Sequence, residues 1–315
     1  MKIVFMGTPA FGCPPLKALI KSSHEILAVV TGTDKPSGRG KKLTPTEVSK
    51  LADKNEFKTL KPISLKDDEL YQSLKALQAD LFVVVAFKIL PERLFSLPKY
   101  GSINIHASLL PKYRGPAPIN WVLINGEKET GLTSFFLKKK VDTGDIILQE
   151  KITIDDKDNY DSLYTKLSNF AGEFLLKTLD LIERKETSPL PQNDHIASTA
   201  PKISSFDALI DFGFPAEKVN NFIRGLSSKP GAYTYFRSKK LKVLSGTVES
   251  EYHKPETRPG TIIINKKNFI IQCANSAIMI NSLIPEGKKQ MDGISFINGF
   301  KPQPGEVLGE LTQRS

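Results

Sequence analysis

The first 185 residues alternate between short apolar runs and stretches with helical periodicity, and this alternation limits the fold more than any other feature of the sequence. Apolar, β-branched runs occupy 2–7, 25–30, 81–87 and 101–108, with amphipathic stretches between them. Strands that alternate with helices form parallel sheets, and a strand that is apolar on both faces has helices on both sides. We therefore expect an α/β domain with a doubly wound, mostly parallel sheet.

A second domain is expected after a polar, proline-rich segment. Apolar residues recur every three or four positions from Tyr160 to Arg184, which predicts an amphipathic helix that closes the first domain at 1–185. Residues 186–203 have no periodicity and are typical of a linker. Residues 204–315 contain one predicted helix and then short β-type runs between turn residues, which indicates a small OB-like β-barrel. Such a barrel could bind nucleic acid or serve only as a structural cap.

The charge balance is strongly basic. Lys and Arg number 44 against 34 Asp and Glu, which gives a net charge of +10 and an isoelectric point near 9.3. A positive excess favours polyanionic partners through long-range attraction and counterion release. The same lysines could serve solubility alone. The distribution of the positive charges along the chain has to distinguish a polyanion-binding surface from a merely soluble one.

Compartment and metal content follow from what the chain lacks. The longest apolar run, 81–87, is far shorter than the roughly 20 residues of a membrane span, and the N-terminus has no secretory pattern. Cys13 and Cys273 are far apart, which suits a reducing compartment, and we interpret both as small buried hydrophobes. No zinc-ligand spacing links them to the four histidines. We expect a cytoplasmic protein without a membrane anchor or a metal.

Two glycine-containing turns do not fit nucleotide motifs. The first strand-to-helix turn, 7–12, lacks the G-x-G-x-x-G spacing that brings backbone close to a pyrophosphate. The stretch 37–42 lacks the G-x-x-x-x-G-K-[ST] spacing of a phosphate loop and does not follow a strand directly. We expect neither a nicotinamide cofactor nor a nucleoside triphosphate site.

Asn104 and His106 stand at the end of a predicted strand. Residues two apart in a strand point to the same face, and the carboxyl ends of parallel strands are where open α/β sheets hold ligands. An amide and an imidazole side by side supply two donors to one oxygen, as acyl transfer requires when a carbonyl becomes an oxyanion. An Asn-x-His pair alone is more often structural, so the interpretation depends on its surroundings.

The surroundings are a loop and a tight turn. Residues 108–118 carry two Gly/Pro turn signals and two cations, which indicates an exposed loop after the strand. Asp142 begins a D-T-G turn, where an aspartate is usually present for turn chemistry. If the turn brings Asp142 beside His106, the carboxylate would orient the imidazole and favour its protonated form.

The combination of Asn104, His106 and Asp142 with the loop SLLPKYRG resembles the folate-dependent formyltransferases. The resemblance implies a formyltransferase-type, Rossmann-like domain in which these three residues act on the formyl group of 10-formyltetrahydrofolate. It also implies a folate site formed by the SLLP segment and by residues after the apolar run 81–87, where Lys88 departs from the longer, glycine-containing stretch of many relatives. These expected folate contacts are Ser108, Leu109, Leu110, Pro111, Phe87, Ile89 and Leu90.

The chain as a whole most resembles those family members that formylate initiator methionyl-tRNA. The features are GTPAF at the start, the loop DKPSGRGKKLTP, and the later segments PINW, TAPKIS and PEGKKQM. This resemblance implies a tRNA-binding role for 204–315 and for a basic arm that approaches the acceptor stem, with Arg39 as its key residue. The arm has no apolar anchor and is either ordered by a polyanion or a solvated surface loop. Its cations are Lys35, Arg39, Lys41 and Lys42.

Other activities remain compatible with the same residues. A formyltransferase for an amino sugar nucleotide would use the same triple, but it has no need for the basic arm. A formylfolate hydrolase would use water as nucleophile, and a catalytically inactive nucleic-acid-binding module would not need the folate site. Asp142, His106 or a bound water could accept the proton of the attacking amine. We expect a monomer, because no feature of the sequence indicates an interface.

Overall fold

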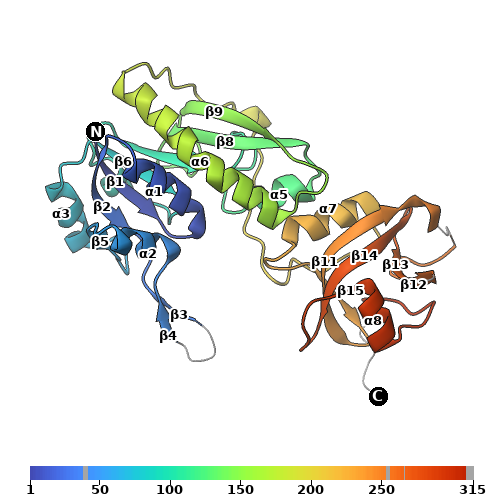
Figure 1. Cartoon of the computed structure of the whole chain (residues 1–315). Helices are drawn as coiled ribbons and strands as arrows, with labels where there is room; N and C mark the ends of the chain where they lie inside the picture. The colour runs from blue at the N-terminus through green and yellow to red at the C-terminus, as the bar shows by residue number, and fades with distance from the viewer. Residues whose placement is uncertain (38–41, 253–255, 266, 310–315) are drawn as a thin grey trace. The chain divides into compact units, whose positions relative to one another are not determined.

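The computed structural model describes residues 1–37, 42–252, 256–265 and 267–309 (Figure 1). The chain packs into two compact units, each built from several segments. The first unit contains 1–115, 129–153 and 164–199, and the second contains 116–128, 154–163 and 200–315. The expected boundaries near 185 and 204 stay a prediction, because these units interleave along the chain.

The first unit is built around a seven-stranded sheet. Four of its six pairings are parallel, those of β1 with β2 and β6, of β2 with β5 and of β6 with β7. The last two strands run antiparallel to their neighbours, an edge arrangement common in mixed sheets. The order across the sheet is β5 (Thr59–Leu60), β2 (Glu25–Val30), β1 (Lys2–Gly7), β6 (Leu81–Val85), β7 (Ser102–His106), β8 (Glu129–Phe136) and β9 (Ile146–Thr153). The expected mostly parallel, Rossmann-like sheet is confirmed.

Helices cover both faces of this sheet. Alternate strand residues such as Val4 and Phe82 pack with α3 and α4 in one apolar cluster. On the other face α6 lies against α1, where Gly172 allows close approach to the Pro14 carbonyl, and Thr178 Oγ1 donates to Ser134 Oγ on β8 (Figure 1). The helices with residues in this unit are α1 (Cys13–Ile20), α2 (Glu47–Lys54), α3 (Asp68–Ala76), α4 (Glu92–Phe95) and α6 (Tyr160–Glu183).

The basic arm begins and ends in a short hairpin. β3 (Lys35–Ser37) pairs antiparallel with β4 (Lys42–Thr44), and the hairpin extends away from the sheet before α2 (Figure 1). The sequence indicated a loop without regular structure here. Each strand has only three residues, which is too short to show the alternation of apolar and polar residues typical of a strand. Two of the expected tRNA contacts, Arg39 and Lys41, lie outside the described residues.

The second unit is an antiparallel sheet curled into a half-barrel with helices packed against it, which confirms the expected small, OB-like β-barrel domain. The register of β11 against β14 shifts around Ser245, and such irregularities increase the local bend of a strand. Phe296 of α8 fills the core between Phe236 and Phe269, with ring centroids 5.3 and 4.9 Å away. The strands are β10 (Tyr233–Phe236), β11 (Lys239–Glu249), β14 (Ala277–Pro285), β13 (Asn268–Gln272) and β12 (Ile262–Asn265), with β15 (Met291–Asp292) beside β14.

Three α-helices lie wholly within the described part of this second unit. α5 packs on α7, where the Asn120 amide donates to the Gly225 carbonyl at 2.8 Å. α8 was not predicted, since its sequence has two glycines and β-branched residues, yet the Asp292 side chain caps its first turn by accepting from Ser295 N. Their bounds are α5 (Pro118–Ile124), α7 (Ala216–Leu226) and α8 (Gly293–Phe300). No helix in the described part of the chain is long and apolar enough to cross a bilayer.

Candidate active site

Asn104 and His106 lie where β7 ends at the carboxyl edge of the first sheet. Asn104 is in register with Val84 of the parallel strand β6, and His106 pairs with Thr133 of the antiparallel strand β8. The two side chains are two residues apart and share a face of the sheet. The strand pairing therefore places both residues at the edge where this class of fold binds ligands.

The Asn104 amide oxygen is buried at this edge. Oδ1 has almost no solvent contact and finds no hydrogen-bond partner within the described part of the chain. A buried polar atom left unsatisfied costs on the order of 1–3 kcal/mol, so such an atom is a candidate for ligand contact. The amide fits a ligand that brings a donor to this edge.

His106 is held between a loop and a carboxylate. Its Nε2 lies 2.8 Å from the Tyr113 carbonyl oxygen, which can only accept, so Nε2–H is the donor. Its Nδ1 lies 3.9 Å from Asp142 Oδ2, and the two side chains are only 8% and 9% exposed. The structure thus brings His106 and Asp142 together, as expected, and adds a main-chain partner that the sequence did not indicate.

Asp142 forms part of a tight turn and also places its carboxylate near His106. Its φ is +54°, in the left-handed region, and its Oδ2 accepts a hydrogen bond from Gly115 N at 2.9 Å. Gly144 is required two residues later, because a Cβ there would lie 1.6 Å from the Phe136 carbonyl oxygen. Asp142 can therefore serve both as a turn residue and as the partner of His106, since the turn itself directs the carboxylate toward the histidine.

The SLLP segment is bonded to β8 and β9. Thr133 Oγ1 donates to the Ser108 carbonyl at 2.7 Å and accepts from Leu110 N at 3.1 Å. Gln149 Nε2 donates to the Leu110 carbonyl at 2.6 Å. The peptide bond from Leu110 to Pro111 is cis. The loop after β7 is thus held by side chains of two strands rather than lying free on the surface.

The other expected folate residues differ in exposure. Leu90 is buried in the apolar cluster with α4, and Phe87 packs against the same cluster. Ile89 is 72% exposed, and Lys88 is exposed beside it. Only Ile89 of these three expected contacts presents most of its side chain to the surroundings, and the assignment of all three stays a prediction.

The described cations of the arm lie on its two strands. Lys35 begins β3 and is exposed, and Lys42 begins β4. The role of these residues in tRNA binding stays a prediction, as does that of Arg39 and Lys41. Within the described residues no cluster of three or more metal-ligating side chains occurs, and the expected absence of a metal stays a prediction as well.

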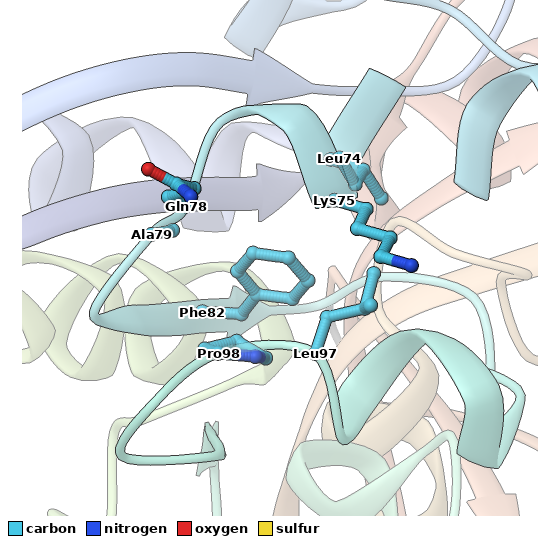
Figure 2. A pocket seen from close by; sticks show the side chains of 7 residues that line it. All are labelled: Leu74, Lys75, Gln78, Ala79, Phe82, Leu97 and Pro98. Atoms are coloured by element: carbon cyan, nitrogen blue, oxygen red, sulfur yellow. The ribbon is translucent and has the colours of Figure 1, made fainter. Parts of the chain in front are cut away.

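A small hollow on the first unit lies away from this edge. It is lined by residues at the end of α3, at the start of β6 and before β7, and its volume is about 30 Å³ (Figure 2). A space of that size holds at most a few water molecules, so it cannot hold a folate. Figure 2 shows Phe82 at its base, between Gln78 and Leu97. The hollow is therefore at the opposite end of β6 from the candidate site.

Three polar residues around the site were not found from the sequence. Thr133 and Gln149 hold the SLLP segment, and Gln192 bonds to the D-T-G turn. Each belongs to a strand or segment that is distant in sequence from the residue it supports. No local pattern marks them, so only the tertiary structure reveals them.

An amide and an imidazole beside a carboxylate, at the carboxyl edge of a doubly wound sheet, define an acyl-transfer type of site. The family model described as formyl transferase matches residues 1–179, and the model of the formyl transferase C-terminal domain matches residues 202–301. The chain belongs to the formyl transferase family.

Relatives of similar length carry a more specific name. A protein of Caldanaerobacter subterraneus named methionyl-tRNA formyltransferase is 42% identical over 310 residues, which cover 98% of this chain and 100% of that protein. A protein of Geobacter sulfurreducens with the same name is 40% identical over 312 residues, which cover 98% and 97% of the two chains. The similarity thus extends through both units.

Among solved structures, the N-formyltransferase from Helicobacter canadensis, in complex with folinic acid and dTDP-3-aminofucose, is similar in fold. The TM-score is 0.66 at 19% identity, and the match covers 89% of this chain and 98% of that chain. At this identity the likeness supports the fold alone.

Proposed function

We propose that the chain transfers the formyl group of 10-formyltetrahydrofolate to the α-amino group of initiator L-methionyl-tRNA, which gives N-formylmethionyl-tRNA for translation initiation. The observation that carries the proposal is the cluster of Asn104, His106 and Asp142 at the carboxyl edge of the sheet. Relatives named methionyl-tRNA formyltransferase that match nearly the whole chain support the choice of acceptor.

The residues of the edge fit a formyl donor. The unsatisfied, buried Oδ1 of Asn104 can accept from an N–H group, and the Asn104 amide nitrogen and His106 can donate to a carbonyl oxygen. When it is bound, 10-formyltetrahydrofolate supplies the formyl carbon that the amine attacks. The SLLP segment, held to Thr133 and Gln149, would form part of the wall for the folate.

The protein's task is to stabilise charge on the formyl oxygen. Asn104 donates from its amide, and His106 in its protonated form donates an N–H to the same oxygen as the amine attacks. Since Nε2–H bonds to the Tyr113 carbonyl in this structure, His106 has to exchange that bond for the formyl oxygen. Asp142 orients the imidazole throughout and balances its charge.

The amine must also lose a proton before the product leaves. Asp142, His106 and a bound water are the three candidates for the acceptor. Expulsion of tetrahydrofolate then leaves the formyl group on the methionyl nitrogen, so one C–N bond forms as another breaks.

The basic arm provides the tRNA-specific part of the proposal. Lys35, Arg39, Lys41 and Lys42 would contact phosphates of the acceptor stem, a form of binding that depends strongly on salt. Phosphate contacts of this kind position an RNA without reading its bases, so the arm would orient the aminoacyl end toward Asn104 and His106.

A second acceptor has support from one observation. The structurally similar Helicobacter canadensis enzyme was solved with dTDP-3-aminofucose, so the same fold accommodates an amino sugar nucleotide in that protein. A single-turnover assay with 10-formyltetrahydrofolate separates the two candidate acceptors. One reaction contains initiator methionyl-tRNA, and a parallel reaction contains an amino sugar nucleotide. We expect formyl transfer to the tRNA. Transfer to the sugar alone would keep the catalytic residues and refute the proposed acceptor.

A further inference from the structure

Gln192 uses its whole side-chain amide within the first unit. Its Nε2 donates to the carbonyl oxygens of Asp142 and Gly144, both at 2.9 Å. Its Oε1 accepts from Arg114 Nε at 3.0 Å and from an Arg114 terminal nitrogen at 2.7 Å. One half-buried side chain therefore satisfies two donors and two acceptors and joins two loops that are far apart in sequence.

The two loops are those that hold the His106 and Asp142 side chains. The carbonyls that Gln192 binds lie on both sides of Thr143, so the bonds fix the turn in which Asp142 has its left-handed φ. Arg114 lies between Tyr113, whose carbonyl accepts from His106, and Gly115, whose N–H bonds to Asp142 Oδ2. Gln192 therefore bonds directly to Asp142, and it bonds to the side chain of Arg114, whose neighbour Tyr113 accepts the hydrogen bond from His106.

The segment around Gln192 is bound to the first unit at several further points. Leu190 exchanges two backbone hydrogen bonds with Ile146, both 2.9 Å long. Ser198 accepts from Tyr113 N through Oγ and from Arg114 N through its carbonyl. Asp194 forms an ion pair with Arg114 at 2.7 Å, and that guanidinium lowers the pKa of the Asp194 carboxyl. These contacts hold Gln192 in place although its surroundings have the composition of a linker.

Only a glutamine side chain meets the needs of this position. A glutamate of the same length could accept from Arg114 but could not donate to two carbonyl oxygens, and a methionine could do neither. An asparagine is one methylene shorter and could not reach both loops from the same backbone.

We propose that Gln192 is a positioning residue for formyl transfer, which holds Asp142 beside His106 by cross-linking the 113–115 loop to the 142–144 turn. The inference rests on the proposed function of that pair. Gln192 need not touch either substrate, so its effect is on the rate of the chemical step rather than on substrate binding. A displacement of a catalytic group by about 1 Å can cost on the order of 100-fold in rate.

The test compares Gln192→Met with wild type in single-turnover formylation of methionyl-tRNA. We expect the single-turnover rate constant to fall on the order of 10- to 100-fold, while the KM values for folate and tRNA, measured separately at steady state, stay within about twofold of wild type. Gln72→Met, at an exposed position on α3, is the matched control and should behave like wild type. A Gln192→Met rate within twofold of wild type would overturn the proposal.

A double-mutant cycle distinguishes positioning from general support of the fold. If Gln192 acts through Asp142, then Gln192→Met should have little further effect in an Asp142→Asn background. Independent, multiplicative losses in the double variant would contradict the proposal. Wild type that does not formylate tRNA at all would refute the proposed function instead, so the two failures are distinguishable.

A substrate-free measurement provides a second readout. Loss of the cross-link should loosen the bond from Gly115 N to Asp142 Oδ2, so the Gly115 amide should exchange faster with deuterium in Gln192→Met than in Gln72→Met. Unchanged exchange would oppose the proposal. If Gln192→Met does not fold, Gln192→Glu decides, since it keeps the acceptor for Arg114 but replaces the two donors to the turn with a carboxylate that repels the two carbonyl oxygens.

Discussion

The carboxyl edge of the first sheet, where we propose the catalytic residues, and the basic arm differ in how their residues are held. At the edge, His106 and Asp142 are buried and bonded to Tyr113 and Gly115 of a neighbouring loop. The described part of the arm is a ladder of three residue pairs, with Lys35 exposed. The edge is therefore organised before any substrate binds, whereas Lys35, in the described part of the arm, presents its side chain to solvent.

This difference matches the two tasks that we propose. Stabilising an oxyanion requires hydrogen-bond donors that are held within a few tenths of an ångström of their ideal positions. The residues around these donors must therefore be rigid. Binding phosphates depends on the number of charges and tolerates variation in their positions. Substitutions at the edge should consequently affect rate or folding, and substitutions in the arm should affect tRNA binding and its salt dependence.

The largest effect is expected for Asn104→Ala, which removes one of the two donors that we propose for the oxyanion. The single-turnover rate should fall roughly 100- to 1,000-fold while the folded state is retained, because the loss of one such donor typically has this cost. Asn169→Ala, at an exposed position on α6 in the first unit, serves as the control. Turnover of Asn104→Ala close to that of the control would contradict the catalytic assignment.

Gly144→Ala tests how tightly the edge is packed. A Cβ at this position would meet the Phe136 carbonyl at 1.6 Å, so the turn has to move or the strand has to shift. We expect a loss of about 3 kcal/mol in the free energy of unfolding, at the upper end of the usual range for overpacked sites. Denaturant titration measures it.

The matched glycine is Gly299 of α8, where a Cβ would meet nothing within 4 Å. Gly299→Ala should not destabilise the protein and should add up to about 1 kcal/mol, since alanine favours a helix over glycine. Equal effects at the two glycines would show that the edge is less tightly packed than the structure indicates.

The parts of the site that the sequence revealed are those governed by local rules. The strand period of two placed Asn104 and His106 on one face, and the D-T-G turn marked Asp142 as a candidate partner. Gln192 could not be found in this way, because its partners are 50 residues away at Asp142 and 78 residues away at Arg114. Its neighbours are also polar and proline-rich, which is the composition of a linker.

The fold shows the same division between local and distant determinants. The alternation of strands and helices predicted the parallel sheet, because each element carries its own periodicity. The packing of α5 with α7 in the second unit has no local signal, since it depends on a contact between Asn120 and Gly225 that spans 105 residues.

A smaller effect is expected when the arm is neutralised. Replacing its four cations with alanine should weaken tRNA binding and flatten its salt dependence, by about one unit of slope for each phosphate that the arm no longer binds, while folate binding is unchanged. Binding measured at several salt concentrations gives the slope. The residues are Lys35, Arg39, Lys41 and Lys42.

The control for the arm removes the same charge elsewhere in the first unit. It replaces four exposed lysines, and the slope should then stay near the wild-type value. A slope that falls equally in both variants would show a general charge effect rather than direct binding of phosphates by the arm. The control residues are Lys54, Lys58, Lys66 and Lys75.

The smallest effect is expected for Leu43→Ala in the arm, paired with Leu110→Ala at the edge. Leu43 is 63% exposed and Leu110 is 3% exposed, so the same change removes buried apolar surface at only one of them. We expect Leu43→Ala to alter the free energy of unfolding by less than about 0.5 kcal/mol and Leu110→Ala to lower it by roughly 2–5 kcal/mol. Urea titration of both variants measures the difference. A loss above about 1 kcal/mol at Leu43 would mean that the arm packs against the protein, and its cations would then be held in fixed positions like the residues of the edge.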